Sequence, residues 1–382
     1  MPIEALPLSE CVGGTLREKV CAERDQPPFD RVAMDGIAGD SDTWRRGERR
    51  LKLQGVQAAG APQGTLARTD HAIEVMTGAI LPVGCDCVVP VEQIDIADGY
   101  ATIRSSADLT PFHNVHRRGS DARQGSLLLD SGTRLRAPEI AVAASAGLAQ
   151  VCVSRQPSIA VISTGDELVE PGEPIADFQV RRSNAYAIAA ALVQRGLTRV
   201  AQDHIRDDEA KLAERLALHL STHDMLVLSG GVSMGRFDLV PKILKQLGVE
   251  QVFHRIAQRP GAPMWFGIGP AGQAVFGLPG NPVSTLICLV RYVMPAIEFS
   301  MGARRSAPER LALAAPVIVH GPRAYFLPVC IEHDESGRPW IRPRPTNGSG
   351  DFLGLTETEG FVELPPGPNT CPQGFVATVY RW

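Results

Sequence analysis

Several features typical of other protein classes are missing from this chain of 382 residues. No run reaches the roughly 18 uncharged apolar residues that a membrane span needs. The sequence does not open with a basic stretch followed by an apolar one, as a signal sequence does. A net charge of −4 provides no overall basic field for nucleic acid. We therefore expect a cytoplasmic protein with no membrane and no nucleic-acid partner.

Paired metal-binding motifs are also missing. The eight cysteines are scattered without a CxxC pair, which indicates reduced, mostly buried thiols. Cys85 and Cys87 precede an expected strand, where their sulfurs would share a face, and we expect packing rather than a metal or redox role. His219 and His223 are four residues apart but lack the glutamate of HExxH, so we expect them on the solvated surface.

Two common nucleotide-binding motifs are absent as well. There is no GxxxxGK[ST], which excludes a P-loop, and the glycines do not fit GxGxxG, which disfavours a dinucleotide fold. Instead, an apolar run ends three times in a glycine-bearing loop. These segments are Ile159-Ala-Val-Ile-Ser-Thr-Gly-Asp-Glu-Leu168, Met225-Leu-Val-Leu-Ser-Gly-Gly-Val-Ser233 and Val275-Phe-Gly-Leu-Pro-Gly-Asn-Pro-Val-Ser284. Ligands of parallel α/β sheets bind outside the carboxyl ends of the strands, so the three loops predict one site.

The glycine loops carry groups suited to a phosphate and a cation. Glycine lets the backbone approach a phosphate closely. Asp166, Glu167 and Asp238 supply carboxylates that suit a Mg²⁺ bridging phosphate oxygens. The residues by themselves thus predict a phosphate-binding α/β domain with Mg²⁺.

The order of elements predicts a multidomain α/β plus β protein. In residues 155–300, strands alternate with helices expected at 184–195, 208–220 and 239–247, which specifies a doubly wound parallel sheet with Asp207 capping the second helix. Residues 1–154 form a split N-terminal region, in which helical segments at 16–25 and 138–147 flank a β domain inserted at about 42–130. Residues 305–382 are rich in proline and β-prone runs, which predicts a small C-terminal β domain.

Six separated motifs, in order, resemble those of one protein family. They are Phe29-Asp-Arg-Val-Ala-Met-Asp-Gly36, Val75-Met-Thr-Gly-Ala79, Arg118-Gly-Ser-Asp121, Ser163-Thr-Gly-Asp-Glu-Leu168, Ser229-Gly-Gly-Val-Ser233 and Leu278-Pro-Gly-Asn-Pro-Val-Ser284. Across residues 1–365 the chain resembles molybdopterin molybdenumtransferase, the MoeA and gephyrin E-domain family. The resemblance implies insertion of molybdate into adenylated molybdopterin, with Mg²⁺ required and AMP released. It also implies a homodimer, with a molybdopterin adenylyltransferase or a molybdoenzyme as candidate protein partners.

The resemblance also implies roles for individual residues. The catalytic residues would be Asp35, Glu167 and Asp238, and these three with Asp166 would hold the metal. Substrate would be bound by Thr77, Asp121, Ser229, Gly230, Gly231, Ser233, Pro279, Gly280 and Asn281. Molybdate would be bound by Arg259, Ser284, Arg323 and Ser349. Taken alone, Asp35 is a turn aspartate and Asp166-Glu167 a helix cap with a first-turn acid; their occurrence in the family order favours the functional interpretation.

The chain departs from the family pattern at three positions. The family's KPGKP segment reads Arg259-Pro-Gly-Ala-Pro263, so Ala262 removes a lysine. Losing one charge-assisted bond to a buried oxyanion costs about 1.5 to 3 kcal/mol, or roughly ten- to a hundredfold in affinity. Arg236 and Arg182 stand where the family has acidic residues, and either would replace the lost charge.

These departures leave four functions open. We favour a working transferase in which the lost lysine is compensated. A non-catalytic, molybdopterin-binding scaffold paralogue that has lost a molybdate-site lysine is the main alternative. A molybdopterin adenylyltransferase resembles residues 155–300 alone, and the additional N- and C-terminal motifs argue against it. A nucleotide-processing hydrolase built on the same domain is the fourth.

Overall fold

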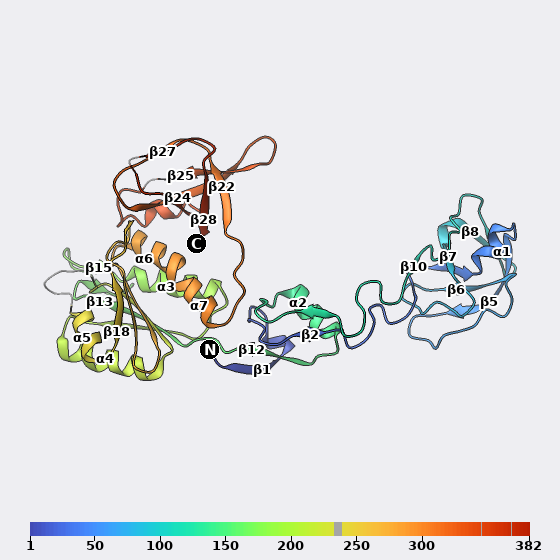
Figure 1. The fold of residues 1–382 in the computed structure, drawn as a ribbon, viewed down its shortest axis with the longest axis horizontal. Helices are drawn as coiled ribbons and strands as arrows, with labels where there is room; N and C mark the ends of the chain where they lie inside the picture. The colour runs from blue at the N-terminus through green and yellow to red at the C-terminus, as the bar shows by residue number, and fades with distance from the viewer. Residues whose placement is uncertain (233–238, 345, 368) are drawn as a thin grey trace. The chain divides into compact units, whose positions relative to one another are not determined.

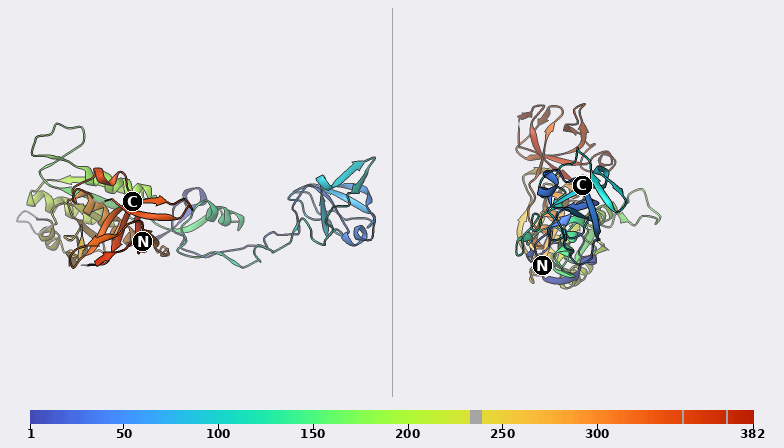
Figure 2. Two further views of the ribbon diagram at one scale, coloured as in Figure 1. Left: turned by 90° about the horizontal axis from the view of Figure 1, so that it is seen from above. Right: turned by 90° about the vertical axis from the view of Figure 1, so that its right-hand side faces the viewer.

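A computed structural model describes residues 1–232, 239–344, 346–367 and 369–382 of the chain (Figure 1). Contacts divide these residues into two compact units. Unit 1 comprises Met1–Arg17, Ser131–Arg136 and Cys152–Trp382, and unit 2 comprises Glu18–Asp130 and Ala137–Val151. Both ends of the chain therefore lie in unit 1 (Figure 2).

The centre of unit 1 is a six-stranded sheet in the order β16-β13-β17-β21-β20-β18. The strands are β16 (Val200–Ile205), β13 (Ile159–Thr164), β17 (Met225–Ser229), β21 (Ala274–Leu278), β20 (Trp265–Ile268) and β18 (Glu250–His254). The first four strands are parallel to one another, and β20 pairs antiparallel with both β21 and β18. β13 and β17 are buried along their whole length, as expected of strands covered on both faces. The predicted parallel sheet is thus confirmed for four strands, and the antiparallel pair was not predicted.

Helices cover both faces of this sheet (Figure 1). α3 (Ser183–Gln194) packs on one face, where Ile188 and Leu192 enter the core. α4 (Glu209–Thr222) and α5 (Val240–Gln246) pack on the other. All three predicted helices are confirmed within two residues. The predicted Asp207 cap is wrong, because Asp208 accepts the capping hydrogen bond from the backbone N of Lys211 at 2.9 Å.

A long helix separates the central sheet from the C-terminal strands. α6 (Pro282–Cys288), a π-helical turn (Leu289–Val293) and α7 (Met294–Ser300) run on from one another. Within the described part of the chain, this stretch is the one helix long and apolar enough to cross a membrane, but 56% of it is buried inside the protein. Its side chains join two core clusters, one with α3 and one with the C-terminal strands. It is therefore a core helix.

The C-terminal strands close into a small β-barrel. Its strands are β22 (Glu309–Leu313), β24 (Ala324–His333), β25 (Pro339–Pro343), β26 (Gly360–Leu364) and β28 (Val376–Arg381). β24 pairs with both β25 and β26, which closes the sheet. β19 (Gln258–Arg259), from the central part of the chain, pairs with β24 as well. The predicted C-terminal β fold is confirmed, and the pairing of β19 connects Arg259 directly to the barrel.

Unit 2 contains a six-stranded sheet of its own in the order β7-β4-β6-β5-β9-β8. Its strands are β4 (Gly36–Gly39), β5 (Arg50–Gln57), β6 (His71–Val75), β7 (Cys87–Pro90), β8 (Ile94–Ala97) and β9 (Tyr100–Ile103). The short helix α1 (Ser41–Arg45) buries Trp44 on one face. This sheet confirms the β fold expected between the two flanking segments, of which the second contains α2 (Ala137–Ser145).

The helical segment expected at 16–25 is wrong. Leu16 forms a bridge with Val153, and β2 (Val20–Cys21) pairs with β11 (Leu127–Leu129). Leu16, Val20 and Ala22 are buried, whereas most residues between them are charged. This spacing by even numbers is the period of a strand, and pairing with distant residues stabilises the extended form.

Cys85 and Cys87 pack in the core, as predicted, but not on the same face. Cys87 joins the cluster around Trp44, whereas Cys85 joins the opposite cluster with Val88. The reason is that Cys85 lies in the turn before β7 rather than in the strand. Burial raises the pKa of each thiol to about 12, which keeps both protonated and unreactive.

The surface position expected for His219 is also wrong. Its ring is buried, and Nε2 lies 2.7 Å from Oδ2 of Asp203 on β16. Arg215 donates to the same carboxylate at 2.8 Å. Burial raises the pKa of Asp203, but the hydrogen bonds from His219 and Arg215 outweigh it and hold that pKa below its ordinary value. Among the described residues, no three His, Cys, Asp or Glu side chains lie grouped so that they could hold a metal ion.

We expect Asp203→Asn to lower the free energy of unfolding at pH 7 by about 1 to 3 kcal/mol, because the substitution removes a charged acceptor from a largely buried cluster. The folded-state pKa is depressed, so this stabilisation is present above the unfolded value of about 3.9 and is lost as the pH falls through the folded value. Urea denaturation of both proteins between pH 3 and 7 measures the difference. Glu209→Gln, which breaks the exposed ion pair between Glu209 of α4 and Lys242 of α5, should change stability by no more than about 0.5 kcal/mol. Equal effects of the two substitutions would contradict this account.

Candidate functional site

Three glycine-bearing loops meet at the carboxyl ends of β13, β17 and β21, as predicted. Gly165, Gly230 and Gly231 have φ values of +139°, +94° and +65°, which favour glycine. A Cβ atom added at Gly230 would lie 2.7 Å from the carbonyl oxygen of Thr164. One added at Gly280 would lie 3.7 Å from Cα of Gly230. The loops therefore lie against one another, and only glycine fits at 230.

These loops line two clefts of about 530 and 370 Å³. The clefts share Thr164, Glu167, Gly230, Gly280 and Asn281. We refer to the two together as the three-loop cleft. Its size is within the range of small-molecule sites, roughly 300 to 1,000 Å³.

Asn184, in the first turn of α3, connects two of the loops. Its Nδ2 donates to Oγ of Ser229 at 2.9 Å and to the carbonyl oxygen of Gly280 at 2.7 Å. Sequence reasoning did not identify Asn184 as a site residue. The available signal was an asparagine inside the first helical turn, where it does not serve as the N-cap. Its contacts to residues 45 and 96 positions away are visible only in the folded chain.

Several buried polar atoms line the larger cleft without a protein partner. Within the described ranges, Oγ of Ser163, Oγ1 of Thr164 and Oδ1 of Asn184 accept or donate no hydrogen bond. All three residues line the cleft, and the two hydroxyl-bearing side chains are at least 97% buried. Buried polar groups are ordinarily hydrogen-bonded. Unpartnered polar atoms of this kind make the larger cleft a candidate site for a polar ligand such as a phosphate.

The predicted carboxylates divide into those inside and outside the cleft. Glu167 lines both parts of it, and its Oε2 would lie 2.5 Å from a Cβ atom added at Gly165. Asp166 points elsewhere, since Oδ1 lies 3.9 Å from Nε of Arg206 and both side chains are exposed. Asp238 and Ser233, with Arg236, lie outside the described residues. One carboxylate beside a phosphate site suits Mg²⁺, which takes one or two carboxylates and completes its shell with phosphate oxygens and water.

Arg182 lines the cleft, but its charge is already paired. Its Nε lies 2.6 Å from Oε1 of Glu170, and its guanidinium stacks near the ring of Tyr186. Burial raises the pKa of Glu170, but the hydrogen bonds from Arg182 and Tyr186 hold it below the ordinary value. The positive charge of Arg182 is therefore neutralised inside the protein. It is poorly suited to replace the lysine lost at Ala262.

The predicted molybdate ligands are partly brought together. Arg259 and Ser349 line a third cleft of about 300 Å³, where the Arg259 guanidinium lies 4.3 Å from the ring centre of Tyr325. Nδ2 of Asn281 donates to Oγ of Ser349 at 2.8 Å, which links this cleft to the third glycine loop. Ser284 is buried in the first turn of α6, and Arg323 is exposed just before β24. The structure therefore groups Arg259 with Ser349 but not with Ser284 or Arg323.

Three predicted site residues belong to unit 2. Asp35 accepts hydrogen bonds from the backbone N and Oγ1 of Thr77, at 2.6 and 2.7 Å. These bonds hold the pKa of Asp35 below its ordinary value, so the carboxylate is ionised at neutral pH. Asp121 lies 2.7 Å from Nε2 of His116. Asp35 and Thr77 thus form one constellation, and Asp121 has a different partner.

Comparison with known families covers nearly the whole chain. Residues 1–147 match the family described as MoeA N-terminal region (domain I and II). Residues 160–298 match a probable molybdopterin binding domain, and residues 310–382 match the MoeA C-terminal region (domain IV). The glycine loops and Asn184 lie within the second of these matches.

Comparison with individual proteins agrees with these family matches. A molybdopterin molybdenumtransferase of Synechocystis is 38% identical over 371 residues, covering 97% of this chain and 93% of the relative. One from Staphylococcus epidermidis is 31% identical over 382 residues, covering 97% and 89%. The solved molybdopterin biosynthesis moeA protein of Pyrococcus horikoshii superposes with a TM-score of 0.81 at 25% identity, covering 100% of this chain and 95% of that one. The chain therefore belongs to the MoeA family and is a molybdopterin molybdenumtransferase of molybdenum cofactor biosynthesis.

Proposed function

We propose that the chain inserts molybdate into adenylated molybdopterin and releases AMP, with the phosphoanhydride bound in the three-loop cleft. The observation that supports this most strongly is the set of unpartnered buried atoms on Ser163, Thr164 and Asn184, which line a cleft between glycine loops. Hydroxyl groups and closely approaching backbone suit phosphate oxygens. The pterin would extend along the rest of the cleft.

We propose that Glu167 accepts a proton from the water that attacks the phosphoanhydride, whose P–O bond then breaks to leave AMP and the pterin phosphate. Of the predicted catalytic carboxylates among the described residues, Glu167 lines the cleft and Asp35 belongs to unit 2. We further propose that Glu167 holds Mg²⁺ in the cleft, where the cation would neutralise charge on the phosphates when bound. Asp166, which lies outside the cleft lining, and Asp238, outside the described residues, stay predicted ligands. Asp35, ionised and ordered by Thr77, stays a predicted ligand that belongs to unit 2.

Glu167→Gln tests this assignment. The substitution keeps the shape of the side chain but removes the base, so AMP release should fall by about 10² or more. The melting temperature should change little, because the side chain is exposed at a strand end. The measurement is molybdate-dependent AMP release from adenylated molybdopterin. The matched control is Glu173→Gln, since Glu173 is also an exposed glutamate between β13 and α3. Activity of Glu167→Gln within twofold of wild type would remove Glu167 from the mechanism.

Asn184 is expected to act as a positioning residue. In Asn184→Asp, a carboxylate would face the Ser229 hydroxyl and the Gly280 carbonyl in place of the donating NH₂ group, and the two loops would separate. We expect the KM for adenylated molybdopterin to rise roughly tenfold or more, with a smaller change in kcat. Gln194→Glu, which adds the same charge at the exposed end of α3, should leave both constants unchanged. An unchanged KM in Asn184→Asp would show that the bridge does not order the cleft.

We propose that Arg259, Ser284, Arg323 and Ser349 bind molybdate and that the lysine lost at Ala262 is compensated. Because Arg182 is paired with Glu170, compensation falls to Arg236. Arg236→Glu should then weaken molybdate binding about tenfold or more, whereas Ala262→Lys should change it little. Titration of AMP release with molybdate measures both. A gain of tenfold or more in Ala262→Lys would mean that the site lacks the cation, as in a scaffold paralogue.

We also propose a cytoplasmic homodimer with domain limits of 1–154, 155–300 and 305–382. A molybdopterin adenylyltransferase or a molybdoenzyme is the proposed protein partner. These assignments extend what the resemblance implies. Light scattering at micromolar concentration should give twice the chain mass of 41.0 kDa, and a value of one chain mass would exclude the dimer.

A further inference from the structure

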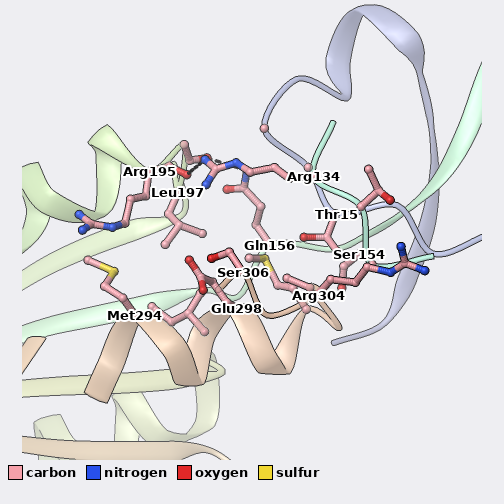
Figure 3. A pocket seen from close by; sticks show the side chains of 18 of the residues that line it. Thr15, Arg134, Ser154, Gln156, Arg195, Leu197, Met294, Glu298, Arg304 and Ser306 are labelled. Atoms are coloured by element: carbon pink, nitrogen blue, oxygen red, sulfur yellow. Dashed lines mark hydrogen bonds between the residues drawn. The ribbon is translucent and has the colours of Figure 1, made fainter. Parts of the chain in front are cut away.

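Unit 1 has a further cavity, of about 380 Å³, away from the glycine loops (Figure 3). Gln156, which lines it, precedes β13, and Leu197 precedes β16. The cavity therefore lies at the amino ends of the parallel strands, whereas the three-loop cleft lies at their carboxyl ends. A strand of six residues, such as β13, separates the two edges by roughly 20 Å. The proposed catalytic function makes no use of this cavity.

The wall of the cavity combines apolar surface with a group of cations. Leu197, Met294 and Ile297 line it with side chains that are at least 96% buried. Arginine supplies four of the other lining residues, and glutamate supplies one. The charged residues are Arg134, Arg195, Arg304, Arg305 and Glu298. Arginine thus outnumbers glutamate in the lining, although the chain as a whole has a net charge of −4.

Two of the arginines are held in place by carbonyl groups rather than by carboxylates. Arg134 donates to the backbone oxygen of Arg195 at 2.8 Å. Arg195 donates to the backbone oxygens of Ala191 at 3.3 Å and Arg381 at 3.0 Å. Burial lowers the pKa of Arg195, Glu298 acts in the opposite direction, and the charge of Arg134 lowers that pKa further. These contacts fix the guanidinium groups but leave their charge in excess.

The charged side chains are spread along the cavity, with polar groups in its middle (Figure 3). In Figure 3 the guanidinium groups of Arg195 and Arg304 lie at opposite ends of the view, with that of Arg134 between them, and Ser306 and Glu298 lie in the middle. Separated cations along a partly apolar wall suit an elongated ligand. A metal cation would be repelled by this wall, and a bare inorganic anion would leave the apolar surface in contact with water.

We propose that this cavity binds a small organic anion that has an apolar body and one anionic group, such as an aromatic carboxylate or sulfonate. The anionic group would contact Arg134, whose planar guanidinium suits oxyanions. The apolar body would cover Leu197, Met294 and Ile297. The cavity volume is within the range of small-molecule sites, roughly 300 to 1,000 Å³. Because the lining comes from distant segments of unit 1, a bound anion would also stabilise the fold.

The test uses the full chain and 8-anilinonaphthalene-1-sulfonate, an aromatic sulfonate that fluoresces in apolar sites. Titration of the wild type should show one saturable component, and the probe should raise the melting temperature. Arg134→Gln should weaken this component about tenfold, and Arg134→Lys should weaken it less because the charge remains. Ser306→Trp, which fills the cavity, should abolish it. Arg310→Gln, on β22 and outside the lining, should leave it unchanged.

Two results would overturn the proposal. One is probe affinity that is the same in wild type, Arg134→Gln and Ser306→Trp, each with a wild-type melting transition. The other is displacement of the probe by inorganic phosphate at concentrations equal to those of the probe, which would show that the apolar wall contributes nothing. If Ser306→Trp does not fold, the comparison of Arg134→Gln with Arg134→Lys and Arg310→Gln decides. Arg134, Ser306 and Arg310 all lie outside the lining of the three-loop cleft, so AMP release tests the proposed function separately.

Discussion

The parallel pairing of β13, β17 and β21 is the constraint on which the site depends. Ser163 pairs with Ser229, and Ser229 pairs with Leu278, so the three strands end at the same level of the sheet. Each strand then turns into a loop that contains glycine, and the loops pack on one another because no side chain separates them. The Asn184 bridge holds two of these loops at a fixed spacing. The loops thereby form a cleft whose lining residues include buried, unpartnered polar atoms.

The two ends of the central sheet carry different chemistry. At the carboxyl ends, hydroxyl groups and closely packed glycines are suited to phosphate, and the nearby Arg182 is neutralised by Glu170. At the amino ends, arginines are fixed by backbone carbonyls, and Glu298 is the one acid among the described residues of the cavity lining. Under the two proposals, an anion at the carboxyl ends would be bound by dipoles, and an anion at the amino ends by full charges beside apolar surface.

Local patterns allowed much of the fold to be predicted from the sequence. The central helices were located from their apolar spacing, and the glycine loops were located from the apolar runs that they end. Features that depend on long-range contacts were missed or misassigned. The segment around Val20 was predicted as helix because its pairing with Leu129 is remote in the sequence. His219 was placed on the surface because its partner, Asp203, lies on another element. Asn184 was missed for the same reason, since both loops that it joins come later in the chain.

The central claim is that the phosphate groups of the substrate bind between the three glycine loops. A crystal structure of the full chain with adenylated molybdopterin tests it most directly. The account predicts phosphate oxygens within about 3 Å of the hydroxyl groups of Ser163 or Thr164 and of backbone atoms in the loops at Gly231 and Gly280. Density for the phosphates elsewhere, with the three-loop cleft containing only water, would contradict it.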